Sequence, residues 1–111
     1  MNLGLRRSLV AIFLVTAVFL LFLPAGRADD TAGLYKAKCA MCHGPDGKGE
    51  TATGKAMKVT DLTSAEIQKK SDAELIASTA NGKGKMPAQK GKVTDAQIKD
   101  LIAYIRGLAK K

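Results

Sequence analysis

The stretch Cys39-Ala40-Met41-Cys42-His43 decides which fold this chain can adopt. Its two cysteines are three positions apart, a spacing that places both thiols on one side of a helix. They are the only cysteines among the 111 residues, and His43 is the only histidine. Apolar residues upstream continue the same helical face. We therefore expect a helix over about 31–42 that presents both thiols and leads directly into the imidazole.

The pattern Cys-x-x-Cys-His is typical of covalent haem c attachment. Each thiol adds to one vinyl group of the porphyrin, and the imidazole supplies a nitrogen to the iron. The alternative is a redox dithiol or a single short disulfide. A thioredoxin-like dithiol requires a strand-to-helix turn, and no stretch of this sequence alternates like a strand. A zinc site built only from Cys and His needs four ligands, whereas the chain has three such residues. The sequence predicts one covalently bound haem c held by Cys39, Cys42 and His43.

Residues 1–28 have the three parts of a secretory signal peptide. Arg6 and Arg7 form a basic head, residues 9–23 form an apolar middle, and a small-residue exit ends at Ala28. A membrane anchor is the alternative. However, fifteen helical residues span roughly 22 Å, against about 30 Å of hydrocarbon. We predict a Sec-type signal peptide cleaved after Ala28, export to the periplasm, and one domain over 29–111, with membrane attachment only if the segment is retained.

The composition excludes several classes of protein. A chain of 111 residues is too short for a multi-domain enzyme, and two cysteines cannot build a disulfide-rich scaffold. Removal of residues 1–28 takes away three arginines and every phenylalanine, which lowers the net charge from +8 to +5 and leaves Tyr35 and Tyr104 as the aromatic residues. So small a core usually needs a bound cofactor. An exported protein without an aromatic stacking platform is also a poor candidate for nucleic-acid binding.

Capping-box spacings mark three helix starts in the second half of the chain. The pairs are Thr63 with Glu66, Ser71 with Glu74, and Thr94 with Gln97. They predict helices near 64–70, near 72–80 (ended by Asn81-Gly82) and over about 95–109, where the apolar residues of the last helix keep one face. The glycine-rich residues 44–54 predict a flexible loop, and residues 82–92 a second loop. The domain is expected to be all-α.

A second iron ligand is sought among the methionines. Met86 precedes Pro87, which restricts the Met86 backbone to extended conformations and helps to aim its side chain. Met41 is too near His43 to reach the opposite side of the ring. Met57 remains an alternative to Met86, and filling gaps in the core is the ordinary role of either residue. Spacing favours Met86 as the second iron ligand, and Met57 is not excluded.

Three features together resemble the class I cytochromes c, in particular their short, single-haem, soluble periplasmic members. These features are the motif followed by Gly44, the Met86-Pro87 pair, and the terminal Tyr104-Ile105-Arg106. The resemblance covers about 31–110. It implies helices wrapped around one covalently bound haem, with crossing N- and C-terminal helices. It also implies His43 as the proximal ligand, Met86 as the distal ligand, and Tyr35 against Tyr104 at the crossing.

The sequence departs from the family pattern at three places. Thr31 stands where the family often has a glycine at the helix contact, which predicts a looser crossing or one offset toward Gly33. Gln89 replaces an aromatic residue common after Met-Pro, which predicts a more polar distal side. No proline lies between Pro45 and Pro87. In the family, the carbonyl of a proline in this region often accepts a hydrogen bond from the proximal histidine. Because this chain lacks that proline, the sequence names no acceptor for the second nitrogen of His43.

Two protein ligands leave no open position on the iron for a substrate. The sequence therefore predicts an electron carrier rather than an enzyme, and Met/His ligation predicts a fairly high potential. Two alternatives remain, namely a haem-bearing subunit of a periplasmic oxidoreductase and a haem sensor or peroxidase-like protein with a displaceable methionine. The expected partners of a monomer are a redox donor and acceptor. Lysines flanking Met86 predict an acidic docking face on a partner, or simply a solvated surface; they are Lys83, Lys85, Lys90 and Lys92.

Overall fold

The computed structural model describes Gly4, Arg7 and residues 27–111. Nearly all of the predicted signal peptide therefore lies outside the described residues. None of the helices within the described part has the length and apolar character needed to cross a bilayer.

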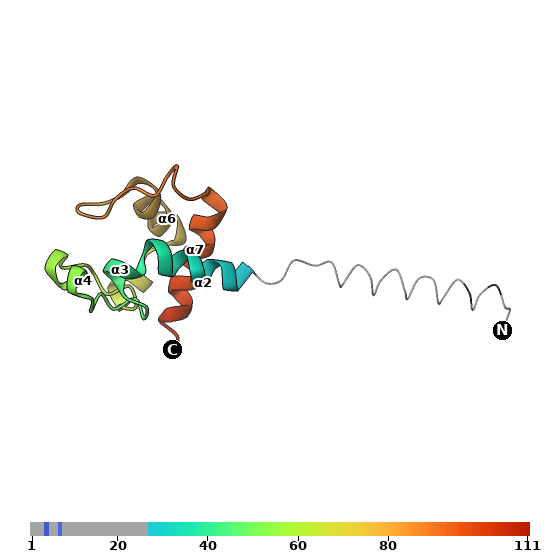
Figure 1. Ribbon diagram of the computed structural model, residues 1–111, viewed down its shortest axis with the longest axis horizontal. Helices are drawn as coiled ribbons and strands as arrows, with labels where there is room; N and C mark the ends of the chain where they lie inside the picture. The colour runs from blue at the N-terminus through green and yellow to red at the C-terminus, as the bar shows by residue number, and fades with distance from the viewer. Residues whose placement is uncertain (1–3, 5–6, 8–26) are drawn as a thin grey trace.

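Residues 27–111 form six helices and no regular strand (Figure 1). The helices are α2 (Arg27–Lys38), α3 (Ala40–His43), α4 (Ala52–Met57), α5 (Ala65–Gln68), α6 (Asp72–Asn81) and α7 (Asp95–Leu108). Within the described residues, isolated bridges join Lys83 to Met86 and Lys90 to Val93. The all-α expectation is confirmed.

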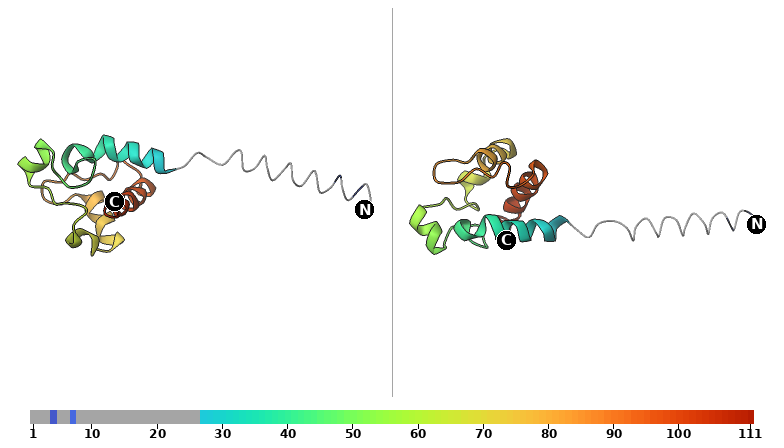
Figure 2. Two further views of the ribbon diagram at one scale, coloured as in Figure 1. Left: turned by 90° about the horizontal axis from the view of Figure 1, so that it is seen from below. Right: turned by 45° about the horizontal axis from the view of Figure 1, so that its top comes forward.

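The helices lie on two sides of the domain. The right-hand view of Figure 2 shows α2, α3 and α4 following one another along one side, with α6 and its following loop on the opposite side. The last helix, α7, packs against both α2 and α6. The attachment motif and the Met86 loop therefore approach the middle of the domain from opposite sides.

The first and last helices of the domain cross, as Figure 1 shows. The rings of Tyr35 in α2 and Tyr104 in α7 lie 5.0 Å apart, tilted by 40°. Tyr35 is almost fully buried, and so is Thr31 one turn earlier. A Cβ added at Gly33 would meet nothing within 4 Å. The predicted tyrosine pair is confirmed, and the crossing is not offset toward Gly33.

The core is small and is built largely by one face of α7. Leu101, Ile102, Ile105 and Leu108 are buried together with Tyr35 and Leu75. Cys39 and Ala40 pack against this cluster while partly exposed. The attachment motif therefore sits at the edge of the core.

Two of the three predicted capping boxes are present. In α6, the Glu74 amide donates to the Ser71 hydroxyl at 3.2 Å and the Ser71 amide donates to the Glu74 carboxylate at 2.9 Å. In α7, Thr94 and Gln97 form the same pair of bonds.

The predicted start of α5 was wrong by one residue. Ser64 caps α5, whereas the Thr63 hydroxyl donates to the Asp61 carboxylate at 2.6 Å. The Thr63 amide donates to the same oxygen at 2.8 Å. The Thr63 hydroxyl is therefore bonded to Asp61 and does not cap α5.

A single arginine ties α7 to the α5–α6 junction. Arg106 donates to the Gln68 carbonyl at 3.0 Å and to the Lys70 carbonyl at 2.7 Å. Two of its nitrogens also donate to one Asp72 carboxylate oxygen, at 3.0 and 2.8 Å. The planar fork of a guanidinium is suited to such a set of acceptors.

Arg106→Lys is expected to lower the free energy of unfolding by about 1–3 kcal/mol, because one ammonium group cannot replace this set of hydrogen bonds. Urea unfolding of the holoprotein, followed by circular dichroism, measures the loss. The control is Asp72→Asn, which weakens only an exposed ion pair and should cost less than about 1 kcal/mol. Equal losses in the two variants would contradict the role given to the carbonyl contacts.

Candidate functional site

The attachment motif forms one turn of helix at the end of α2. Cys39 interrupts the predicted 31–42 helix, since it lies between α2 and α3. Hydrogen bonds nevertheless continue through the break, with the Cys39 amide donating to the Tyr35 carbonyl at 2.8 Å and the His43 amide donating to the Cys39 carbonyl at 2.9 Å. Both cysteines are free and half-buried. The structure therefore brings Cys39, Cys42 and His43 together in one turn.

Burial raises the pKa of the Cys39 thiol to about 11, and the neighbouring Cys42 adds to the shift. The Cys39 thiol therefore stays protonated at neutral pH. A reactive redox dithiol depends on a lowered thiol pKa. The electrostatics at Cys39 thus disfavour the dithiol alternative.

The His43 imidazole is kept neutral. Burial lowers its pKa, and the backbone of Thr60 opposes this shift in part. That backbone does not complete a hydrogen bond, because Nδ1 of His43 is buried without a partner among the described residues. A neutral imidazole is the form that ligates a metal, and an unpartnered buried nitrogen is rare unless a bound group explains it. Two free thiols and this ring in one turn fit haem c.

The residue after the motif is held by the crossing tyrosine. The Tyr35 hydroxyl donates to the Gly44 carbonyl at 2.7 Å inside the protein. Burial raises the pKa of Tyr35, so this hydroxyl remains a donor throughout the physiological range. Gly44 has φ +78° and ψ 161°, a conformation open essentially to glycine.

The loop predicted over residues 44–54 ends three residues earlier than expected, at Thr51. Residues 52–57 form α4, and the capping Thr51 joins it to the motif. The Thr51 hydroxyl donates to the carbonyls of Met41 at 2.7 Å and Cys42 at 3.1 Å, and accepts from the Gly54 amide at 2.9 Å. A Cβ at Gly54 would overlap the Cys42 carbonyl oxygen. Glycine therefore allows α4 to pack directly on the backbone of the attachment turn.

Thr51→Val is expected to lower the free energy of unfolding of the holoprotein by about 1–3 kcal/mol. It removes a helix cap and the donor to two motif carbonyls. Thr53→Val is the control, because it makes the same chemical change inside α4 without touching the cap. Thermal unfolding followed at the haem absorption measures both variants. Equal stability of the two would show that the Thr51 bonds contribute nothing.

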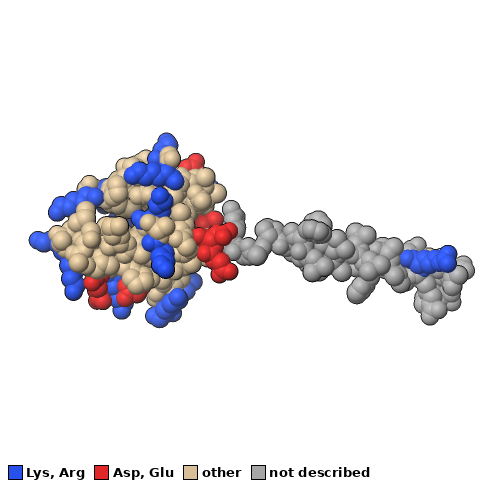
Figure 3. Space-filling view, viewed as in Figure 1, with Lys and Arg blue, Asp and Glu red and all other residues tan. Residues whose placement is uncertain are grey.

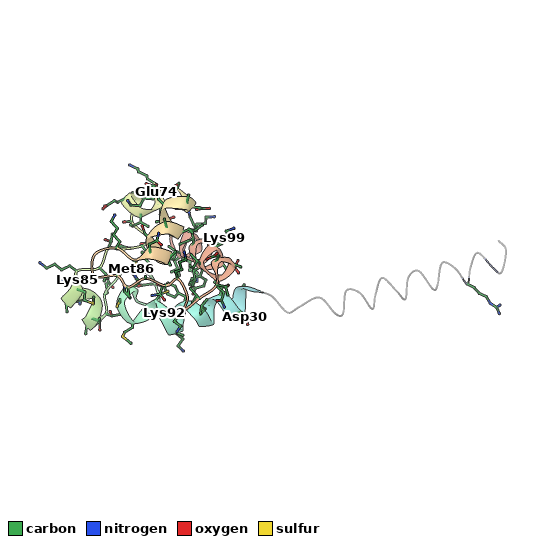
Figure 4. The ribbon with its side chains drawn as sticks, turned by 90° about the horizontal axis from the view of Figure 1, so that it is seen from above. Asp30, Glu74, Lys85, Met86, Lys92 and Lys99 are labelled. Atoms are coloured by element: carbon green, nitrogen blue, oxygen red, sulfur yellow. The ribbon has the colours of Figure 1, made fainter. Side chains whose placement is uncertain are left out.

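Met86 lies in a loop that is bonded to itself and to α6. Lys83 and Met86 exchange backbone hydrogen bonds of 3.1 and 3.0 Å. Figure 4 shows Met86 between the labelled Lys85 and Lys92. The alternative ligand, Met57, is the last residue of α4, on the same side of the domain as the motif. Both methionines are half-buried, so their burial does not distinguish them.

A polar side chain is buried beside Met86-Pro87. Gln89 is 8% exposed, and its Nε2 donates to the Pro87 carbonyl at 3.4 Å. Gln89 stands where an aromatic residue is common after Met-Pro, and its side-chain amide turns back onto the loop. Pro87 itself is exposed.

The surface is basic over much of the domain. Figure 3 shows lysines and arginines spread over much of the visible face, with acidic side chains in smaller groups at the right and lower left of the domain. Lysines flanking Met86 are all exposed; they are Lys83, Lys85, Lys90 and Lys92. Met41, inside the attachment motif, is 73% exposed. Within the described residues, no group of three His, Cys, Asp or Glu side chains is placed to hold a metal ion.

Comparisons with known proteins agree with this fold and this motif. A family model described as cytochrome c oxidase, cbb3-type, subunit III, matches residues 26–105. Cytochrome c6 of Nostoc sp. is 36% identical over 104 residues, which are 92% of this chain and 91% of that protein. Cytochrome c6 of Leptolyngbya boryana is 37% identical over 86 residues, which are 76% of this chain and 98% of that protein.

Two further comparisons show the extent of the likeness. The cbb3-type cytochrome c oxidase subunit CcoP of Azospirillum brasilense is 33% identical over 86 residues, which are 76% of this chain but only 29% of that subunit. The solved structure of the KustC0563 c-type cytochrome superposes with a TM-score of 0.65 at 32% identity, over 70% of this chain and 95% of that one. The chain belongs to the class I cytochromes c. It carries covalently bound haem c and transfers electrons between redox proteins rather than acting as an enzyme.

Proposed function

We propose that Cys39 and Cys42 hold haem c through two thioether bonds and that His43 and Met86 are the axial ligands of its iron. The observation that carries this proposal is the neutral, half-buried imidazole of His43 in the same turn as two free thiols, with its buried Nδ1 lacking a partner among the described residues. Bound haem c supplies a one-electron couple between Fe(II) and Fe(III).

The placement of the loops supports Met86 over Met57. The motif lies on the side of α2, α3 and α4, whereas the Met86 loop follows α6 on the opposite side (Figure 2). Two ligands of one metal must approach it from different directions. Met57 ends the helix that packs on the motif itself, so it approaches from the side that His43 already occupies.

The ligand set explains why the protein is a carrier. Two side chains on the iron leave no position for a substrate. A thioether is a soft ligand that favours Fe(II), and burial in an apolar surrounding disfavours the additional positive charge of Fe(III). Both effects raise the reduction potential.

The proposed attachment is tested by the spectrum of denatured, reduced protein in alkaline pyridine, together with the mass of the intact protein. We expect the spectrum of a haem with two saturated vinyl positions and a mass that exceeds that of the exported polypeptide by one haem. A mass equal to that of the exported polypeptide alone contradicts the proposal.

We propose that the protein is exported to the periplasm and cleaved after Ala28. Because α2 begins at Arg27, this cleavage removes two helical residues and leaves the buried Thr31 and Tyr35 in place. Asp29 and Asp30 then open the helix, where acidic side chains favour the positive end of its dipole. N-terminal sequencing of the exported product should begin at Asp29. Recovery of the full 111 residues would instead support a retained anchor.

A haem-bearing subunit of a larger oxidoreductase is the second candidate, because the matching family model describes an oxidase subunit. The cytochromes c6, in contrast, are matched over nearly their whole length. Gel filtration of a native extract from the source cells distinguishes the two. A free carrier elutes at the size of a monomer, whereas a subunit elutes with its complex.

The exposed lysines around Met86 are proposed to steer the protein to an acidic face of a redox partner. Reversing two of them, Lys85→Glu with Lys90→Glu, should slow electron transfer with an acidic redox protein about tenfold or more at low ionic strength, and much less at high salt. Stopped-flow mixing measures the second-order rate constant. Lys99→Glu with Lys110→Glu is the matched control on α7 and the residues after it, and Figure 4 shows Lys99 away from Met86. Equal slowing by both pairs would indicate an effect of net charge alone.

A further inference from the structure

The chain makes a sharp turn where α6 ends. Gly82 has φ +78° and ψ 165°, a region of backbone space that is essentially restricted to glycine. A Cβ at this position would lie 2.7 Å from the Met86 carbonyl oxygen, 2.8 Å from the Ala88 nitrogen and 3.1 Å from the Pro87 carbonyl carbon. These neighbours are backbone atoms, so they cannot swing aside as a flexible side chain would.

The same stretch of loop is bonded to the end of α6. The Gln89 amide donates to the Thr79 carbonyl and the Lys90 amide donates to the Ala80 carbonyl, both at 3.0 Å. These are carbonyls of the last turn, which have no partner within the helix itself. The segment 86–90 is therefore held against α6 by direct contact at Gly82 and by two hydrogen bonds that follow at once.

We propose that Gly82 is a positioning residue for the distal iron ligand, because its missing side chain lets the Met86-Pro87-Ala88 backbone lie directly on the end of α6. This inference rests on the proposed role of Met86. Any side chain at position 82 pushes that backbone outward and carries the Met86 sulfur with it. The motif side of the domain, with Cys39, Cys42 and His43, is left unchanged.

The test compares Gly82→Ala with Gly91→Ala in the haem-loaded protein. Gly91 is the matched control, because it also has positive φ (+85°) and lies in the same loop, yet a Cβ there meets nothing within 4 Å. The readouts are the far-red Fe(III)–sulfur charge-transfer band and the affinity of the ferric protein for added imidazole, which competes with Met86. In Gly82→Ala we expect loss of most of the band and imidazole binding tightened about tenfold or more. Gly91→Ala should match the wild type in both.

The outcomes separate this inference from the proposed ligand set. Absence of the band in the wild type, or its persistence in Met86→Ala, would remove Met86 as the ligand. If the band depends on Met86 but Gly82→Ala retains it with unchanged imidazole affinity, only the role of Gly82 is overturned. Equal effects of Gly82→Ala and Gly91→Ala would also overturn that role, since they would reflect backbone strain alone.

A measurement on the wild type covers the case in which Gly82→Ala fails to fold. Hydrogen exchange of the Gln89 and Lys90 amides is followed along a urea titration, together with the sulfur band. If contact of this backbone with α6 is what places the Met86 sulfur, protection of the two amides and the sulfur band should disappear at the same urea concentration. Loss of the band while both amides stay protected would contradict the proposal.

Discussion

Replacement of both Cys39 and Cys42 by alanine is expected to abolish covalent haem binding and, with it, the stable fold. A domain of this size with one small core rarely holds more than about 3–5 kcal/mol without a cofactor, metal or disulfide. Here the hydrophobic cluster around α7 holds only six buried side chains, with Cys39 packed at its edge. Without its covalent cofactor, the double variant should lose most of its helical structure.

Haem staining on a denaturing gel measures attachment in this variant, and far-UV circular dichroism measures the fold. Met41→Ala is the control, because Met41 lies between the two cysteines but is 73% exposed. It should retain both haem and helicity. A double variant that is colourless yet unfolds in one sharp thermal transition would show that the chain folds without the cofactor.

Met86→Ala should abolish the far-red Fe(III)–sulfur band and lower the reduction potential. Axial ligands set haem potentials over a range of about 0.8 V, so loss of the thioether should produce a fall that is a sizeable part of this range. The vacated position should also let the ferrous protein bind carbon monoxide rapidly, which the wild type should not do.

Spectroelectrochemistry of ferric and ferrous protein measures these changes. Met57→Ala is the matched control, since Met57 is also half-buried and differs in lying at the end of α4. If the band is lost in Met57→Ala and persists in Met86→Ala, Met57 is the distal ligand instead of Met86. Rapid carbon monoxide binding by the wild type would favour the sensor or peroxidase-like alternative.

Local sequence patterns predicted the elements whose causes are local. The α7 helix combines a capping box at Thr94 with an apolar residue on every turn of one face, and both signals lie within the helix itself. The Ser71 capping box and the glycine at position 82 delimit α6 in the same way. The grouping of Cys39, Cys42 and His43 follows from their spacing alone.

The elements that the sequence did not predict depend on contacts between separate segments of the folded chain. Residues 52–57 include Gly54 and carry no apolar stripe, so α4 lacks a periodic signal. Thr51 is a good capping residue and was the only local indication. The Thr51 hydroxyl that caps α4 also donates to two motif carbonyls, and only the folded chain brings these groups together. The contact of Gly82 with the Met86 loop is equally invisible in the sequence.

The helix crossing at Tyr35 and Tyr104 has a consequence for how the protein matures. Tyr35 meets a ring nearly seventy positions further along the chain and also binds Gly44, directly after the attachment motif. Both cysteines stay half-buried in the folded domain, so docking of α7 does not bury the thiols. During synthesis from the N-terminus, the attachment turn is complete long before α7 is made. The two ends of the domain therefore meet last, and the Tyr35 hydroxyl links their meeting to the backbone that follows the attachment turn.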